Sequence, residues 1–132
     1  MDNSTDLRLH DAELIGMVVD RINEFARFEF RLENGALRSA QLDGLKAFRS
    51  EDMTLQNVVS RVLRSSKGEI ARERIEHWLV WATSLSDADS WLSDQRKREW
   101  LDACGDGALE LVVIEPSAGA QIAAVCARIT VI

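Results

Sequence analysis

The stretch EIARERIEHWLVWATSLSDADSWLSDQRKREWLDAC, residues 69–104, decides the fold of this 132-residue chain. It contains all four tryptophans, and its apolar residues recur at helical intervals, whereas the sequence on both sides alternates as β-strands do. Neither flank alone has enough apolar strand to close a core. We therefore expect one or two tryptophan-bearing helices packed on a sheet drawn from both flanks.

Two helix starts are predicted by Ser-x-x-acid signatures, in which a serine caps the first turn and an acidic residue follows three positions later. The first is Ser66 with Glu69. The second is Ser86 with Asp89, and it opens a helical piece that carries Trp91. The apolar residues beyond Trp91 do not continue its face, which predicts a break near residues 93–94.

The first predicted helix has one clear apolar stripe. It consists of Ala71, Ile75, Trp78, Ala82 and Leu85. At about 100° per residue, Trp81 lies roughly 90° from this stripe and Val80 lies almost opposite it. The helices therefore carry more large apolar side chains than one sheet face can bury, with Trp91 and Trp100 among the surplus.

The N-terminal flank predicts a meander of strands. Residues 13–20 form an apolar, β-branched run with an interruption at Gly16 that is typical of a bulge. In residues 27–33 apolar and charged side chains alternate strictly, and Asn34 with Gly35 predicts a tight turn. A two-residue loop would place Leu37, Ser39 and Gln41 beside the phenylalanine face, and a bulged loop would place Ala36, Arg38 and Ala40 there; both remain open.

Later segments complete the predicted sheet. Residues 54–64 have helical apolar spacing, but three of the five apolar positions are valine, which favours a strand. Residues 109–114 and 122–132 are nearly all apolar, as in strands covered on both faces, with a turn at 116–119 and the C-terminus held in the sheet. The predicted fold is α+β: a largely antiparallel sheet from both chain ends, with two or three helices over about 67–104 packed on it. We expect a single domain, 1–132, with 1–6 as a flexible lead-in.

Composition narrows the classes of function. The net charge of −6 disfavours a nucleic-acid binder, which needs a basic face, and also an anionic membrane surface. No apolar run approaches the length of a membrane span, and the polar start predicts no secretory signal. With only two cysteines, Cys104 and Cys126, we expect buried free thiols and a cytoplasmic protein.

No set of residues predicts a reaction. His10 and Asp11 are adjacent, so on a strand they would point to opposite faces, and His77 lies off the main helical stripe. The histidines and cysteines lie in four separate elements without the spacing of metal ligands, so we expect no metal, cofactor or catalytic residues. The basic run 96–98 is interpreted as an ion-paired helix face.

The surplus tryptophans give the leading hypothesis. We expect a non-catalytic domain that binds another protein or itself through a surface containing Val80, Trp81, Trp91 and Trp100. The acidic composition favours a basic partner. The alternative is a small-molecule-binding domain or minor hydrolase with a pocket between sheet and helices near His10 or His77.

Overall fold

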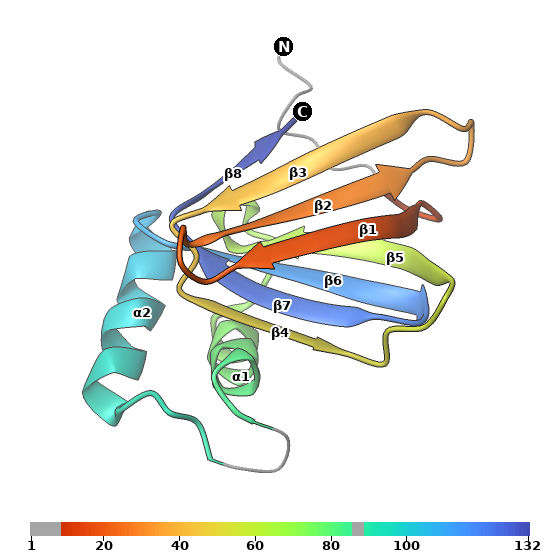
Figure 1. Ribbon diagram of the computed structural model, residues 1–132. Coiled ribbons are helices and arrows are strands. Elements are labelled where there is room, and N and C mark those ends of the chain that lie inside the picture. Colours follow the sequence, from red (N-terminus) through yellow and green to blue (C-terminus); the bar gives the residue numbers. More distant parts are fainter. Residues whose placement is uncertain (1–8, 86–88) are drawn as a thin grey trace.

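The computed structural model describes residues 9–85 and 89–132, and within them it contains one eight-stranded antiparallel sheet and two α-helices (Figure 1). The strands are β1 (Glu13–Asp20), β2 (Phe25–Arg31), β3 (Leu37–Asp43), β4 (Ala47–Glu51), β5 (Asn57–Arg64), β6 (Glu110–Ala118), β7 (Gln121–Cys126) and β8 (Arg128–Val131). The helices are α1 (Arg72–Ala82) and α2 (Asp94–Asp106), and a 3₁₀ turn, η2 (Ser65–Lys67), follows β5. The predicted α+β class is confirmed; the predicted lead-in 1–6 lies outside the described residues.

The sheet folds over on itself. Its strand order is β4-β7-β6-β5-β1-β2-β3-β8, but β1 pairs with β5 only at Glu13 and Leu14. Around this narrow joint the half made of β1, β2, β3 and β8 lies against the half made of β4 to β7 (Figure 1). The facing sides of the two halves enclose a core that includes Phe28, Phe30 and Ile122.

The two halves meet again at a corner formed by Gly44 and Ala127. The chain bends at Gly44 between β3 and β4, and at Ala127 between β7 and β8. The Ala127 amide donates a hydrogen bond to the Asp43 carbonyl (2.9 Å), and the Lys46 amide donates one to the Val125 carbonyl (2.8 Å). Paired strands thus continue from one half of the sheet into the other, as in packings that turn a corner.

A second core lies between the sheet and the helices. Along β6, Leu111 and Val113 face α1 and α2, whereas Val112 and Ile114 face the inner core. Both faces of β6 and β7 are covered, which explains their nearly continuous apolar sequence and confirms that prediction. The expectation that the sheet needed the helices to close a core was incomplete, because the folded sheet also encloses one of its own.

Both predicted helix starts are corrected. The helix α1 begins at Arg72, and its N-cap Ala71 has no side chain that can cap it. Ser66 instead donates a hydrogen bond to Glu110, and Glu69 accepts one from the Arg64 amide (2.8 Å). Ser66 and Glu69 therefore have the spacing of a capping box but do not cap a helix. Their hydrogen bonds attach η2 and the residues after it to the sheet.

The helix α2 begins where the sequence predicted a break. Ser93 is its N-cap and accepts a hydrogen bond from the Arg96 amide (3.1 Å), so Trp91 precedes the helix rather than lying on it. Ser86 lies outside the described residues. Gly107, at φ 88°, ends α2 in the left-handed conformation that favours glycine.

The bulge and the hairpin register are resolved. The pairing of β1 with β2 shifts between Leu14 and Gly16, which confirms the predicted bulge. The β2 to β3 hairpin has a three-residue loop closed by Leu32 and Ala36, and Ala40 lies opposite Phe28. This is the bulged alternative. Residues 57–64 form a strand, as their valines favoured.

Candidate functional site

Val80 and Trp81 lie on α1 and are both half-buried. The ring of Trp81 packs edge-to-face against Trp78, with centroids 5.4 Å apart. The guanidinium of Arg49, from β4, lies 4.4 Å from the Trp81 ring centroid and donates a hydrogen bond to the Trp81 carbonyl (2.9 Å). Trp81 therefore contributes to holding α1 on β4, since a cation over an indole ring is an attractive contact.

Trp91 and Trp100 form the other half of the predicted surface. Their rings meet edge-to-face at 6.0 Å, and Trp91 is 57% exposed whereas Trp100 is 8% exposed. The Trp91 amide donates a hydrogen bond to the Thr83 carbonyl (2.8 Å), which ties this segment to the end of α1. Trp91 is thus a large apolar side chain in a fixed position that the fold leaves in solvent.

These two rings line a groove of about 560 Å³, which we call the tryptophan groove. It lies where three parts of the chain meet: the turn between β1 and β2, the corner between β3 and β4, and the segment that enters α2. Its lining residues are Val19, Arg21, Glu24, Leu45, Lys46, Ala47, Phe48, Trp91, Arg96 and Trp100. The groove has an aromatic wall and a charged rim, which is the composition of many binding surfaces.

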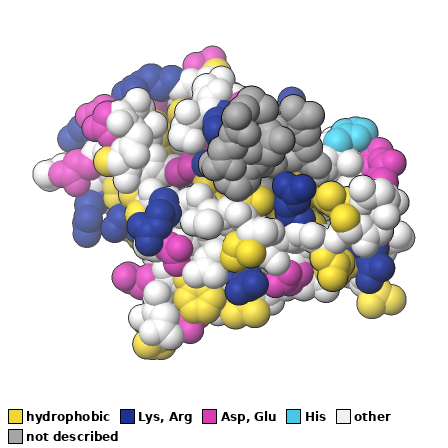
Figure 2. Space-filling model, turned by 90° about the horizontal axis from the view of Figure 1, so that it is seen from above, with side chains coloured by type: hydrophobic (Ala, Val, Ile, Leu, Met, Phe, Trp, Pro, Cys, Tyr) yellow, Lys and Arg dark blue, Asp and Glu magenta, His cyan; other side chains and the backbone are white. Residues whose placement is uncertain are grey.

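The rim of the groove is basic. Arg21, Lys46 and Arg96 contribute three positive charges against the single negative charge of Glu24. None of these four side chains forms an ion pair with any residue that the structure describes. The whole chain carries −6, and on the face shown in Figure 2 cationic and anionic side chains are interspersed. The groove is therefore a local basic site on an acidic protein.

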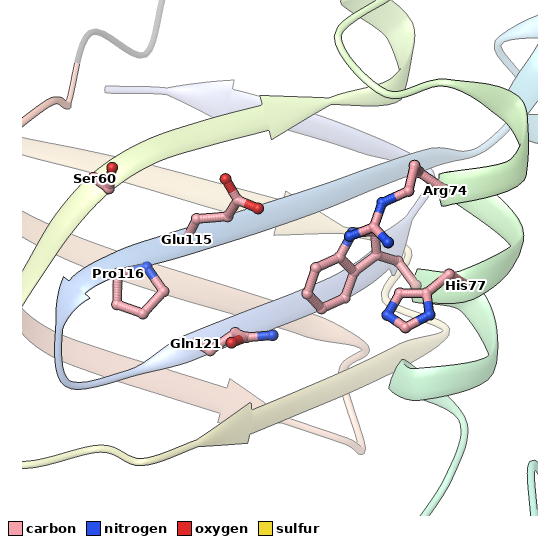
Figure 3. A pocket seen from close by; sticks show the side chains of 7 residues that line it. Ser60, Arg74, His77, Glu115, Pro116 and Gln121 are labelled. Atoms are coloured by element: carbon pink, nitrogen blue, oxygen red, sulfur yellow. The ribbon is translucent and has the colours of Figure 1, made fainter.

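A second hollow, of about 490 Å³, lies between α1 and the sheet beside His77 (Figure 3). It is lined by Ser60, Arg74, His77, Trp78, Glu115, Pro116 and Gln121. The sequence placed a candidate pocket between sheet and helices near His77, and this hollow is in that place.

The polar groups of this hollow differ in their partners. Glu115 forms an ion pair with Arg61. Arg74 lies over the Trp78 ring at 5.8 Å and has no ion pair within the described chain. Figure 3 shows Ser60 and His77 at opposite ends of the hollow, so the histidine does not activate that hydroxyl as a nucleophile.

His10 lies in an exposed turn rather than on a strand. Asp11 has φ 63°, and this turn brings its carboxylate to 3.1 Å from His10 Nδ1, so the expectation that the two side chains point apart was wrong. Glu33 brings a third possible ligand atom within 4.8 Å. All three side chains are exposed, and we assign no metal to them.

Both cysteines are buried and free, as predicted. Burial raises the pKa of the Cys104 thiol to about 11 and that of the Cys126 thiol to about 12. Both groups are protonated at neutral pH. Because the thiolate is the nucleophile and the metal ligand, these cysteines are packing residues.

Sequence reasoning identified Trp91 and Trp100 but missed Arg21, Lys46 and Phe48 as their neighbours. These residues come from distant segments, and no spacing links them. Arg96 was visible only as part of the basic run 96–98. The interpretation of that run holds for Lys97, whose ammonium lies 3.5 Å from Glu76, but not for Arg96, which lines the groove.

No protein-family model matches this chain, and neither the curated proteins nor the solved structures gave a significant match. Within the described residues, neither helix has the length and apolar character needed to cross a membrane.

Proposed function

We propose that this protein is a non-catalytic interaction domain that binds a partner protein through the tryptophan groove. The observation that carries the proposal is the 57% exposure of Trp91 beside three cations, none of which forms an ion pair within the described residues. Tryptophan and arginine are the residue types most enriched at interaction hot spots, and a fixed aromatic side chain loses little entropy on binding. Two buried free thiols are typical of a reducing compartment, so we propose a cytoplasmic location.

The basic rim changes the expected chemistry of the partner. Overall charge favours a basic partner, but the groove itself presents Arg21, Lys46 and Arg96. Attraction between opposite charges is strongest at contact distance, and salt largely screens it beyond about 10 Å. The segment that enters the groove should therefore be acidic and carry an apolar side chain for Trp91.

Affinity purification from the native cell, with four forms of the protein, tests this proposal. The unchanged chain and a control, Leu37→Ala, should retain the same partner, because Leu37 is 67% exposed on β3 and does not line the groove. Trp91→Ala and Arg96→Glu should lose that partner. Binding is then measured directly with the purified partner. Equal retention by all four forms would exclude the groove as the binding site.

The hollow beside His77 supports a second candidate function, the binding of a small polar molecule. Ser60, Arg74, His77 and Gln121 have no hydrogen bond or ion pair to any described side chain, and all four line one hollow. Polar side chains that line a hollow with an aromatic wall are typical of ligand sites.

Chemical-shift perturbation by a panel of amino acids and small carboxylates tests this second function. A true ligand should shift resonances of α1 and β6 residues that line the hollow, and Arg74→Gln should weaken its binding. Lys67→Gln, on η2 outside the hollow, serves as the control. Shifts that are absent, or equal in both variants, would exclude the hollow.

A further inference from the structure

We propose that the occupant of the tryptophan groove is an acidic loop of a second copy of this chain, residues 51–55, so that copies associate head to tail. The inference rests on the proposed function of the groove. It is carried by the juxtaposition, at the two ends of β4, of a basic aromatic groove and an acidic apolar loop.

The last residue of β4 and the loop that follows it have the sequence Glu51-Asp52-Met53-Thr54-Leu55. Leu55 is fully exposed, at 101%, and Met53 is 47% exposed. Among the large apolar side chains described as exposed, Leu55 is the most exposed. An acidic loop that holds two apolar side chains in water has the composition that the groove requires of its ligand.

The loop is fixed in shape before it binds. Asn57, which is buried, accepts a hydrogen bond from the Thr54 amide (2.9 Å) and donates one to the Thr54 carbonyl (2.7 Å). The Thr54 hydroxyl donates a further bond to the Gln56 carbonyl (2.8 Å). A loop that is already ordered loses little conformational entropy on docking, so its apolar side chains contribute more of their burial to affinity.

Loop and groove are complementary in charge as well as in apolar surface. Asp52 has no ion pair within the described part of the chain, and neither do Arg21, Lys46 or Arg96 of the groove. Glu51 is already paired with Arg49, so Asp52 is the carboxylate available to a partner. Docking would bring the Asp52 carboxylate of one copy to the cations of the groove in the other. Trp91 would then cover Met53 or Leu55.

A chain cannot fill its own groove. Lys46, Ala47 and Phe48, at the start of β4, line the groove, whereas the loop follows Glu51 at the end of the same strand (Figure 1). Five residues of strand extend over roughly 15 Å. Because groove and loop are different surfaces, the contact is heterologous, and each copy can engage one neighbour at each end.

Sedimentation velocity of two variants, separately and mixed, tests the proposal. Arg96→Glu damages the groove and keeps the loop, and the double variant Asp52→Lys with Leu55→Ser damages the loop and keeps the groove. All three side chains are exposed, so both variants should fold. The unchanged chain should form larger species as its concentration rises. Each variant alone should weaken association about tenfold or more.

The mixture separates this mechanism from other kinds of self-association. An equimolar mixture contains one intact groove and one intact loop per pair, so it should form a discrete heterodimer that does not grow further. The Trp91 emission should shift to shorter wavelength as the ring leaves water. Leu37→Ser is the control and should associate as the unchanged chain does, since Leu37 lies on β3.

A chain that stays monomeric at every concentration, or variants that do not combine when mixed, would overturn the inference. The proposed function has a separate outcome. If the chain is monomeric but Trp91→Ala still loses a partner, the groove binds a different protein and only the second copy is excluded. If neither association nor partner retention responds to Trp91→Ala, the groove itself is excluded.

Discussion

Arg64 and Glu110 form a buried, two-pronged ion pair at the point where β5 ends and β6 begins. Arg64 Nε lies 2.9 Å from Glu110 Oε2, and Arg64 Nη2 lies 2.8 Å from Oε1. The residues are 8% and 5% exposed. Ser66 donates a third hydrogen bond to the same carboxylate, so η2 is attached to the strand that begins the C-terminal flank. The pair thus joins the two flanks of the sheet across 46 residues of sequence.

Removing one member of this pair should destabilise the protein strongly. In Glu110→Gln the buried Arg64 guanidinium loses the carboxylate that accepts two of its hydrogen bonds, and the expected loss is about 3–5 kcal/mol of unfolding free energy. Urea denaturation measures this loss. Arg61→Ala is the control: it breaks the exposed pair with Glu115, whose Arg61 side chain is 64% exposed, and should cost about 1 kcal/mol or less.

A double variant, Arg64→Met with Glu110→Leu, separates the cost of leaving the Arg64 charge without the Glu110 carboxylate from the net contribution of the pair to stability. Two apolar side chains of similar volume leave no unpaired charge, so the double variant should recover much of the stability that Glu110→Gln loses. A double variant less stable than Glu110→Gln would show that the polar contacts of the pair hold the strands together.

The same carboxylate should make stability depend on pH. Burial alone would raise the pKa of Glu110, but hydrogen bonds from Arg64 and Ser66 and the charge of Arg64 outweigh it and hold the pKa below its ordinary value of 4.5. Since the pKa is lower in the folded state than in the unfolded state, the stabilisation is fully present above about pH 4.5. It is lost as pH falls through the folded-state pKa.

Urea midpoints of the unchanged chain and Glu110→Gln, compared between pH 7 and pH 3, test this dependence. The difference in unfolding free energy between them should be largest at pH 7 and should narrow below pH 4.5, because only the unchanged chain has this proton to bind. A difference that stays constant over this range would assign the acid sensitivity to other carboxylates.

The fold class followed from local patterns, because the alternation of residues 27–33, the bulge at Gly16 and the valines of 54–64 each reflect one strand and its two faces. The positions at which the helices begin could not be predicted from local patterns. Ser66 and Glu69 have the spacing of a capping box, but their partners are Glu110 and the Arg64 amide. A contact 44 residues away decided the role of Ser66, and no short-range pattern contains that information.

Only part of the groove could be predicted from the sequence, because local patterns identify its tryptophans but not the residues that reach it from distant segments. Trp91 and Trp100 are large enough to be recognised as surplus from one helical pattern, whereas Arg21 and Lys46 join them only through the corner at Gly44. That corner depends on a close approach between strands of the two flanks. Periodicity predicts which face of a strand is buried, but not which distant turn lies beside it.

Gly44→Ala should therefore be more damaging than an ordinary glycine substitution. Gly44 has φ 65°, and a Cβ at this position would lie 2.7 Å from the Ala127 Cβ, so both the backbone and the corner contact must change. Gly35→Ala is the matched control, since Gly35 has φ 86° but open space around it. We expect about 1–2 kcal/mol of destabilisation at Gly35 and roughly 1–3 kcal/mol more at Gly44.

Thermal unfolding of both variants measures this difference, and Ala127→Gly in the Gly44→Ala background tests its cause. Removing the Ala127 methyl group should recover the stability that Gly44→Ala loses through the clash between the two Cβ atoms. The stability lost through the positive φ of residue 44 should not be recovered. Equal losses at Gly35 and Gly44 would show that the corner adapts without strain.

Replacement by alanine should destabilise the protein much more at Trp100 than at Trp91. Trp100 is 8% exposed in the core beneath α2, so Trp100→Ala should cost about 3–5 kcal/mol of unfolding free energy. Trp91 is 57% exposed and loses mainly its edge-to-face contact with Trp100, so Trp91→Ala should cost about 1 kcal/mol or less. Urea denaturation of the two variants measures these values, with Leu37→Ala as an exposed control on β3. A large loss at Trp91 would mean that this side chain holds the fold together, and it would remove the main reason for assigning Trp91 to a binding surface.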